Sequence, residues 1–515
     1  MDVEVGQLTD LLNILPGVIQ MNYTPSRTAL ALALASAFFT TSFLVAEAGE
    51  NPGKKKDFGV TVEQLLNAQS ETLFGFNQPL IQSAPETTGA YRSPAQQAID
   101  QVLVADGLNA TYLTRNAADK TDMMAFYPLD NPTHLITCVE GGRQDLGGGK
   151  FNPSIQSIHL TSGEVKTILR GLDSCDGIRT TPWNTILATE EDDQGGAYEI
   201  IDPLNVVNQT VLDRGAGTTT DPAHIAKRTA LPTMAWEGLE ILSSGVVIAG
   251  DELRPGTPTG TGNDADGGAI FKFVPQTVRI GNQPINDLAS SPLTAGTVYA
   301  LQVSCVNNKQ QFGQGCEIGN ADWIPIIDPG QARAEANANG ATGYYRPEDL
   351  HQDLSYADPI NPESVRFCWA NTGNEGAFNF GEVICGVDDN PAEDEAKPAR
   401  QIDVNRFVEG DADFNSFDNL EFQPKTGNLY VIEDHENGDI FACLPDGKDR
   451  DIKTDGCVKM LSVKDSSAEP TGFIFTGDGT TAYVSIQHSN DGNMTKVDDY
   501  HTDDVIRITG FKIKK

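Results

Sequence analysis

A cysteine and a following acid are the residues of this chain best suited to metal chemistry. Cys175 lies in a loop that contains glycine, and Glu190 closes an apolar stretch 15 residues later. A thiolate is a soft ligand and a carboxylate offers hard oxygens, so the pair could hold a mixed metal cluster. The alternative is half of a disulfide beside a solvated acidic loop, and the spacing leaves both readings open.

Four further carboxylates stand at comparable positions, each just before a later apolar stretch: Glu237, Glu348, Asp418 and Glu469. Carboxylates that converge repel one another unless cations neutralise them, which favours Ca²⁺ or another hard metal. Arg346 lies beside one of these acids, and its planar guanidinium suits an oxyanion such as phosphate. A structural salt bridge from Arg346 to Glu348 or Asp349 is the alternative.

Other common catalytic patterns are absent from the sequence. The chain contains no Gly-rich phosphate loop, no Gly-x-Ser-x-Gly and no His-Glu-x-x-His. Its 7 histidines are scattered, so a histidine-based zinc or iron site is not expected. A metal would therefore have to lie among carboxylates, with or without one thiolate.

Repeated short strands must position these side chains. Apolar stretches with polar or acidic ends recur at 134–140, 184–191, 245–252, 365–371, 427–434 and 481–488. Most are followed by glycine and a second strand, at 196–202, 268–274, 381–385 and 438–443. If the recurring strands are the inner strands of radial sheets, their acidic ends meet around one axis.

This repeat predicts an all-β fold, a six-bladed β-propeller. The gap between the third and fourth units is about twice the others, so residues 276–345 are expected as an insertion with a strand at 296–303. A two-layer sandwich and a tandem array of small β domains are the rival architectures.

The N-terminal residues predict export. Arg27 precedes the apolar run 28–46, and the small-x-small pattern that follows suits cleavage, so residues 1–48 are expected to be an upstream extension plus a signal peptide, with the start at Met21. A membrane anchor is the alternative. Residues 49–125 are expected as an N-terminal extension with helices near 60–66 and 93–99, and residues 126–515 as the propeller.

Charge and cysteines restrict partners and compartment. The formal charge is −36, which disfavours nucleic acid and anionic membrane as partners, and we expect a monomer. Eight cysteines suit an oxidising compartment. Three local pairs predict disulfides, whereas the other two cysteines either pair with each other or leave Cys175 free: the local pairs are Cys305/Cys316, Cys368/Cys385 and Cys443/Cys457, and the remaining two are Cys138 and Cys175.

Taken together, the ordered motifs resemble the PhoX family of secreted bacterial alkaline phosphatases. The resemblance runs from about residue 130 to 490 through Cys-x-Gly at Cys175, Arg-Pro-Glu-Asp at Arg346, Phe-Asp-Asn-Leu at Phe417 and Glu-Pro-Thr-Gly at Glu469. It implies a six-bladed propeller with an iron–calcium cluster that hydrolyses phosphate esters, the iron being held partly by a cysteine thiolate.

The resemblance also implies roles for single residues. Cys175 matches the iron-ligating cysteine, and Arg346 matches the arginine that binds phosphate. The matching carboxylate ligands are Glu190, Glu237, Glu348, Asp418 and Glu469. The chain departs from the family pattern at Asp176, Ala188 and Trp236, and only Arg27 precedes the apolar run where many members have a twin-arginine signal; it resembles a divergent member.

The expected function is that of a secreted or periplasmic metal-dependent phosphatase that uses Ca²⁺ and Fe³⁺ on small-molecule phosphate esters. In this hypothesis the acids hold the cations, the metals polarise the phosphoryl oxygens, and Arg346 stabilises charge on them. One alternative is a calcium-binding propeller without catalysis. The other is a calcium-dependent propeller hydrolase of the lactonase or phytase type.

Overall fold

Short buried strands separated by tight turns build the molecule. The segment Leu429–Glu433 is buried along its whole length, and Gly427 just before it has a φ of 72°, which suits glycine in a tight turn. A strand buried on both faces must lie in a sheet that is packed between other parts of the protein. The alternation of such strands with turns predicts stacked antiparallel sheets.

The computed structural model describes residues 58–87, 91–256, 267–304, 317–393, 402–445, 456–489 and 492–513. Asp57–Lys515 form one compact unit. The expected signal segment 28–46 and the pair Cys305/Cys316 lie outside the described residues.

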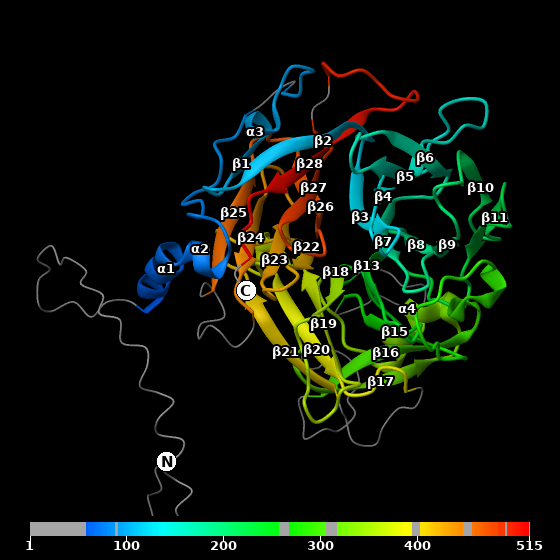
Figure 1. Cartoon of the computed structure of the whole chain (residues 1–515). Coiled ribbons are helices and arrows are strands. Elements are labelled where there is room, and N and C mark those ends of the chain that lie inside the picture. Colours follow the sequence, from blue (N-terminus) through cyan, green and yellow to red (C-terminus); the bar gives the residue numbers. More distant parts are fainter. Residues whose placement is uncertain are drawn as a thin grey trace, which may run out of the picture. The chain divides into compact units, whose positions relative to one another are not determined.

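Five sheets arise from the described strands (Figure 1). The first has the order β11 (Thr218–Thr219), β10 (Gln209–Asp213), β6 (Val165–Arg170), β5 (Pro153–His159), β4 (His134–Val139), β3 (Thr121–Tyr127). The second is β12 (Ile225–Lys227), β9 (Ala197–Ile200), β8 (Ile186–Glu190), β7 (Cys175–Thr180).

The third sheet is nine-stranded, and its two halves meet where β17 pairs with β21. Its order is β13 (Trp236–Ile241), β14 (Val247–Asp251), β15 (Ile270–Pro275), β16 (Gly296–Ser304), β17 (Gly319–Ile326), β21 (Ile402–Glu409), β20 (Glu382–Asp388), β19 (Val365–Asn371), β18 (Pro347–Gln352).

The last two sheets each include a strand from the N-terminal part of the unit. One is β1 (Val102–Val104), β25 (Cys457–Val463), β24 (Asp439–Cys443), β23 (Leu429–Glu433), β22 (Phe417–Phe422). The other is β2 (Asn109–Ala118), β28 (Thr502–Thr509), β27 (Thr481–Gln487), β26 (Glu469–Phe475).

The described helices are few and short. They are α1 (Phe58–Ala68), α2 (Ser70–Leu73), α3 (Ala98–Gln101) and α4 (Ala332–Asn339), with 3₁₀ turns η1 (Leu288–Ser290), η2 (Pro292–Thr294), η3 (Pro329–Gln331) and η4 (Glu375–Ala377). None of the helices in the described part of the chain is long and apolar enough to cross a membrane.

Six strands form a closed circle around the centre of the molecule (Figure 1). In order around the circle these inner strands are β3, β7, β13, β18, β22 and β26, and β26 contacts β3 again. A pairing between an early and a late strand of the chain also closes the circle. Strand β2 pairs with β28, and Ala110 lies opposite Ile508. An early strand and the last strand of the unit therefore share one sheet, a closure typical of propellers.

The predicted all-β, propeller-like class is confirmed, whereas the sheets as they pair number five instead of six. The recurring apolar stretches are strands, as predicted, but each is the second strand of its sheet: β4, β8, β14, β19, β23 and β27. The inner strands are the acid-bearing segments just before them.

The segments expected as an N-terminal extension and as an insertion both contribute strands to the sheets. The segment 49–125 contributes β1 and β2 to two sheets, and the boundary at 125 falls inside β3. Residues 276–345 contain β16 and β17 of the nine-stranded sheet as well as α4. The predicted helices near 60–66 and 93–99 correspond to α1 and to α3, which begins at Ala98.

Disulfides stabilise the sheets. Cys368 bonds to Cys385 between β19 and β20, and Cys443 bonds to Cys457 between β24 and β25, as predicted. Cys138 and Cys175, whose pairing the sequence left open, form a third disulfide. Three disulfides fit an extracellular protein.

Candidate metal centre

A bulge recurs at the same place in every inner strand. The pairing of each inner strand with its neighbour shifts register once near the centre: at Thr121/Met124, Cys175/Ile178, Trp236/Leu239, Pro347/Leu350, Phe417/Leu420 and Thr471/Ile474. A bulge breaks the alternation of side chains and re-aims the residues within it.

The first residue of the bulge is acidic in five of the six inner strands. These residues are Asp122, Asp176, Glu237, Glu348 and Asp418, whereas β26 has Gly472 at this position. A second set of acids follows the neighbouring strands: Glu140 after β4, Glu191 after β8, Glu252 after β14 and Asp434 after β23. Both sets face the centre because every sheet repeats the same geometry.

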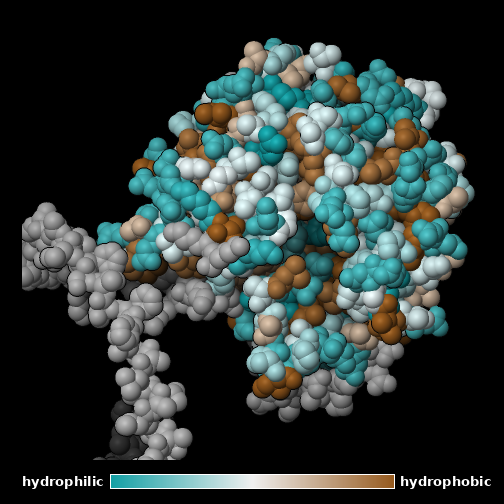
Figure 2. All heavy atoms as spheres, in the orientation of Figure 1, coloured by the Kyte–Doolittle hydropathy of each residue, from teal (hydrophilic) through white to brown (hydrophobic). Residues whose placement is uncertain are grey.

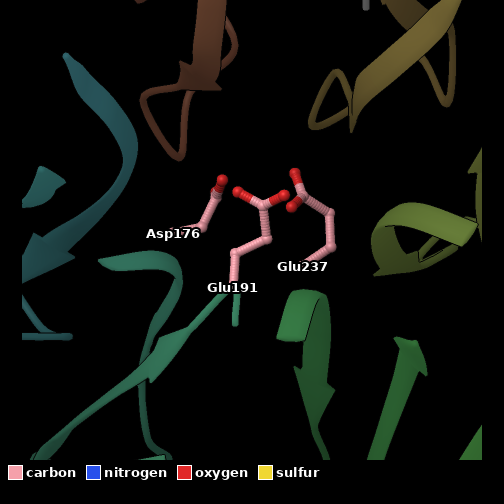
Figure 3. A group of neighbouring side chains, drawn as sticks. All are labelled: Asp176, Glu191 and Glu237. Carbon is pink, nitrogen blue, oxygen red and sulfur yellow. The ribbon is translucent and has the colours of Figure 1, made fainter. Parts of the chain in front are cut away.

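Five of these acids approach one another closely enough to share cations. Carboxylate oxygens of Asp176, Glu191 and Glu237 lie within 4.8 Å of one another, and so do those of Glu237, Glu348 and Asp418. Figure 3 shows Asp176, Glu191 and Glu237 directed toward one another from neighbouring strands. Glu237 belongs to both groups, and we call the five residues the carboxylate centre.

Three of the five residues of the carboxylate centre are buried, and Glu191 and Asp418 are partly buried. Asp176, Glu237 and Glu348 are at most 4% exposed. Burial raises the pKa of each of these carboxyls well above its usual range, and neighbouring carboxylates raise the pKa further. On the face of the molecule that Figure 2 shows, hydrophilic side chains lie around a hollow near the middle.

A hard cation fits this set of donors. Buried carboxylates destabilise the ionised state of one another, and a divalent cation removes that penalty. The Oδ1 atom of Asp176 is buried and has no hydrogen-bond partner. Since Ca²⁺ binds through several carboxylate oxygens in flexible geometry, the residues present suit it.

Arg346 lies at the edge of the carboxylate centre and contacts three acids. Its guanidinium donates to Glu252, to Asp434 at 2.9 Å and to Glu348 at 3.1 Å. The salt bridge to Glu348 that the sequence left open is therefore present. Arg346 has a φ of 57°, uncommon for a residue with a side chain.

In the remaining part of the circle, the acids Asp122 and Glu140 accept hydrogen bonds from neighbouring side chains. Asp122 accepts from the hydroxyl of Thr471 and from the amide of Gln487 at 2.7 Å, and Gln487 also donates to Glu140 at 2.8 Å. These contacts leave Asp122 outside both groups of closely spaced acids. The closely spaced acids thus lie on one side of the circle, and the acids on the other side are bonded to the amide of Gln487.

The structure brings three of the expected ligands together and leaves three apart. Glu237, Glu348 and Asp418 belong to the carboxylate centre. Glu469 accepts instead from His488 at 2.8 Å. Glu190 is paired opposite Cys175, binds Arg214 at 2.7 Å and belongs to neither group.

Cys175 does not supply a thiolate in this structure, because its sulfur is bonded to Cys138. An iron held partly by that thiolate does not fit the residues as they stand. Asp176, the neighbour of Cys175, belongs to the carboxylate centre, whereas Cys175 does not.

Two members of the carboxylate centre were missed from the sequence. Glu191 is one residue past the expected Glu190, and Asp176 is one residue past the expected Cys175. Each follows a residue, Glu190 or Cys175, that matched the expected ligand pattern. The bulge in β7 decides that Asp176 faces the centre, and the alternation along β8 decides between Glu190 and Glu191.

The fold and the centre together define a propeller-like protein with a buried, acidic, metal-compatible centre. Residues 254–490 match the family described as alkaline phosphatase PhoX. This match confirms the resemblance over that part of the chain. It includes Arg346, Glu348 and Asp418 but not Asp176, Glu191 or Glu237.

The likeness to one solved structure supports the fold. Pseudomonas fluorescens PhoX in complex with vanadate, a transition state analogue, superposes with a TM-score of 0.55 at 16% identity, covering 85% of this chain and 98% of that one. The PQQ-bound aldose sugar dehydrogenase of Streptomyces coelicolor gives a TM-score of 0.37 at 10% identity, covering 78% and 98%. Among curated proteins, none matches the chain by sequence.

Proposed function

We propose that the protein is an exported, metal-dependent phosphatase that hydrolyses small phosphate esters at the carboxylate centre. The observation that carries the proposal is the juxtaposition of two groups of buried and partly buried carboxylates, joined by Glu237, with the guanidinium of Arg346. The family match over the segment with Arg346, Glu348 and Asp418 supports the same class of reaction.

Charge balance makes the reaction depend on cations. Arg346 supplies one positive charge, and it already contacts Glu252, Glu348 and Asp434. A phosphate dianion would be repelled by this surplus of acids. Bound divalent cations, for which we propose Ca²⁺, would offset the acids and polarise the phosphoryl oxygens.

The residues of the chain have separate tasks in this proposal. Asp176, Glu191, Glu237, Glu348 and Asp418 hold the cations. Arg346 orients the phosphate and stabilises charge on its oxygens, because a guanidinium can donate two parallel hydrogen bonds to them. Glu252 and Asp434 fix the guanidinium plane toward the centre.

Two architectural proposals accompany this function. We propose that the nine-stranded sheet consists of two blades, β13–β16 and β18–β21, which β17 joins at their outer edges; this count would give six blades. We also propose that the chain is a monomer exported by an N-terminal signal peptide, consistent with its disulfides.

The test is hydrolysis of an aryl phosphate by the purified exported protein, with Ca²⁺ present and after chelation. Arg346→Gln is expected to lower kcat/KM by about a hundredfold or more, because it removes a charge-stabilising donor. Arg279→Gln is the matched control, since Arg279 bonds the carbonyl of Gly281 on an exposed loop. An Arg346→Gln variant as active as Arg279→Gln would contradict the proposal.

A second candidate function is a calcium-binding propeller without catalysis. The Cys138–Cys175 disulfide favours it, since that bond removes the thiolate on which the iron of the family depends. Calcium binding with no hydrolysis of any phosphate ester would support this candidate and exclude the phosphatase. Hydrolysis of lactones alone would exclude both.

A further inference from the structure

Two neighbouring residues of β7, Cys175 and Asp176, direct their side chains to different surroundings at the edge of the carboxylate centre. Cys175 is fully buried and belongs to the same apolar cluster as Cys138 and Ile178. Asp176, the next residue, lies against Glu191 and Glu237. The sulfur therefore lies in the core between sheets, and the carboxylate faces the centre.

Asp176 is a buried acid of this group with an unsatisfied oxygen. It is 3% exposed, its side chain is directed toward Glu191 and Glu237 (Figure 3), and its buried Oδ1 atom has no hydrogen-bond partner. A buried carboxylate oxygen without a donor is costly unless a cation or proton satisfies it. This unsatisfied oxygen points to a ligand independently of the clustering of acids.

The donors of the carboxylate centre are all oxygens. Neither of its two groups contains a cysteine or histidine among the described residues. Carboxylates select hard cations such as Ca²⁺, whereas thiolate and imidazole favour softer transition metals. The irregular spacing of five carboxylates suits the flexible coordination of Ca²⁺ better than the strict octahedron of Mg²⁺.

The backbone fixes Asp176 next to Glu237. A Cβ atom on Gly177 would lie 1.9 Å from the carbonyl oxygen of Glu237, so β7 and β13 meet there without room for a side chain. The hydroxyl of Thr189 also donates to the Gly177 carbonyl at 2.9 Å. The disulfide at Cys175 and this close approach hold Asp176 from both sides.

We infer that Asp176 takes the ligand position adjacent to the disulfide-bonded Cys175 and makes the centre an all-oxygen calcium site that does not hold iron through sulfur. This inference rests on the cation-binding part of the proposed function and does not require catalysis. It differs from the iron–calcium cluster implied by the family resemblance.

The experiment measures metal directly. The exported protein is purified from medium supplied with calcium and iron, its metals are quantified by elemental analysis, and the Cys138–Cys175 bond is checked by peptide mass spectrometry. Calcium titrations of the chelated protein then compare the wild type with Asp176→Asn. Asp192→Asn is the matched control, because Asp192 lies beside Glu191 but binds Arg214 at 2.8 Å.

The inference predicts stoichiometric calcium, sub-stoichiometric iron and an intact disulfide. Asp176→Asn is expected to weaken calcium binding by about tenfold or more, since the affinity of such sites depends on the number of charged ligands, while Asp192→Asn leaves it unchanged. Glu191→Gln provides a second test should Asp176→Asn fail to fold.

The opposite results separate the two proposals. Stoichiometric iron with a free Cys175 thiol, or equal calcium affinity in the wild type and Asp176→Asn, would overturn the inference even if phosphatase activity is present. Calcium binding that depends on Asp176 in a protein without phosphatase activity would support the inference and contradict the proposed phosphatase.

Discussion

At the scale of single residues, the carboxylate centre depends on a charged group behind it. Asp349 follows Glu348 in β18 and is buried. It pairs with Arg179 at 2.8 Å and with His351 at 3.1 Å, and it accepts from the backbone N–H of Leu420 at 3.2 Å. Asp349 therefore links the strand of Glu348 to the strand of Asp418.

Removing the charge of Asp349 is expected to destabilise the protein. Although burial opposes it, the charges of His351 and Arg179 lower the pKa of Asp349, so the carboxylate is ionised in the folded state. Asp349→Asn leaves both cationic groups without this partner and should lower the free energy of unfolding by about 3 kcal/mol. Urea unfolding measures the change.

The matched control is Glu164→Gln, which removes an exposed carboxylate paired with Lys166 at 3.2 Å. Exposed pairs contribute about 1 kcal/mol or less. Equal losses of stability in Asp349→Asn and Glu164→Gln would show that Asp349 does not hold the strands of Glu348 and Asp418 together.

A pH dependence follows from His435 and Glu433, which lie 3.4 Å apart. The hydrogen bond to Glu433 raises the pKa of His435 to about 9, although partial burial opposes the shift. The unfolded histidine titrates near about 6.5. Since the folded pKa is the higher one, the contribution of His435 is fully present below about pH 6.5 and is lost as the pH rises through about 9.

His435→Gln should therefore destabilise the protein more at pH 6 than at pH 10. Thermal unfolding of both proteins across this range measures the difference, and His224→Gln is the control because His224 pairs only with Asp221 at 2.9 Å among the described ion pairs. A constant difference between wild type and His435→Gln at all pH values would contradict the assignment.

The sequence could indicate acids of the centre but not which of two neighbours faces it. Glu237, Glu348 and Asp418 were found because each precedes an apolar strand at a comparable position. Glu190 was preferred over Glu191 on spacing, yet the alternation along β8 turns Glu190 toward Arg214. A one-residue choice of this kind depends on register, which spacing does not contain.

At the scale of elements, the bulged inner strand is the unit that repeats. The second strands were predictable because they are apolar and begin after turns. The inner strands were not, because their bulges interrupt the period of two with pairs such as Asp176-Gly177 and Asp418-Asn419. Those pairs resemble turn sequences, although here they aim acids at the centre.

Gly177→Ala tests how closely two inner strands approach. The added Cβ would overlap the Glu237 carbonyl, a backbone atom that cannot rotate away. We expect a loss of about 3 kcal/mol in the free energy of unfolding and weaker calcium binding. Gly477→Ala is the matched control, because nothing lies within 4 Å of its added Cβ; equal effects of the two substitutions would contradict the close approach.

At the scale of the whole molecule, closure of the circle lets distant segments share one centre. Asp176 and Asp418 come from different sheets and lie far apart in the chain. No local sequence pattern can therefore predict how close they lie in the fold. The propeller-like class could be predicted from the repeat, whereas the joining of β17 to β21 could not, since it depends on an edge pairing between units.

The whole protein should be stabilised by the cation that neutralises its centre. A ligand that binds only the folded state adds about 2.7 kcal/mol when its concentration is a hundred times its Kd. We therefore expect Tm to rise with calcium and to fall after chelation. Sodium chloride at matched ionic strength is the control for the net charge of −36, and an equal rise of Tm in both salts would contradict specific binding.

The most direct test of the central claim is calorimetric calcium titration of Glu237→Gln, because Glu237 is the residue that both groups of the carboxylate centre share. Glu240→Gln, three residues along the same strand and outside both groups, is its control. The predicted result is the loss of calcium binding together with phosphatase activity in Glu237→Gln alone. Calcium binding in Glu237→Gln equal to that of Glu240→Gln and the wild type would contradict a metal site at this centre.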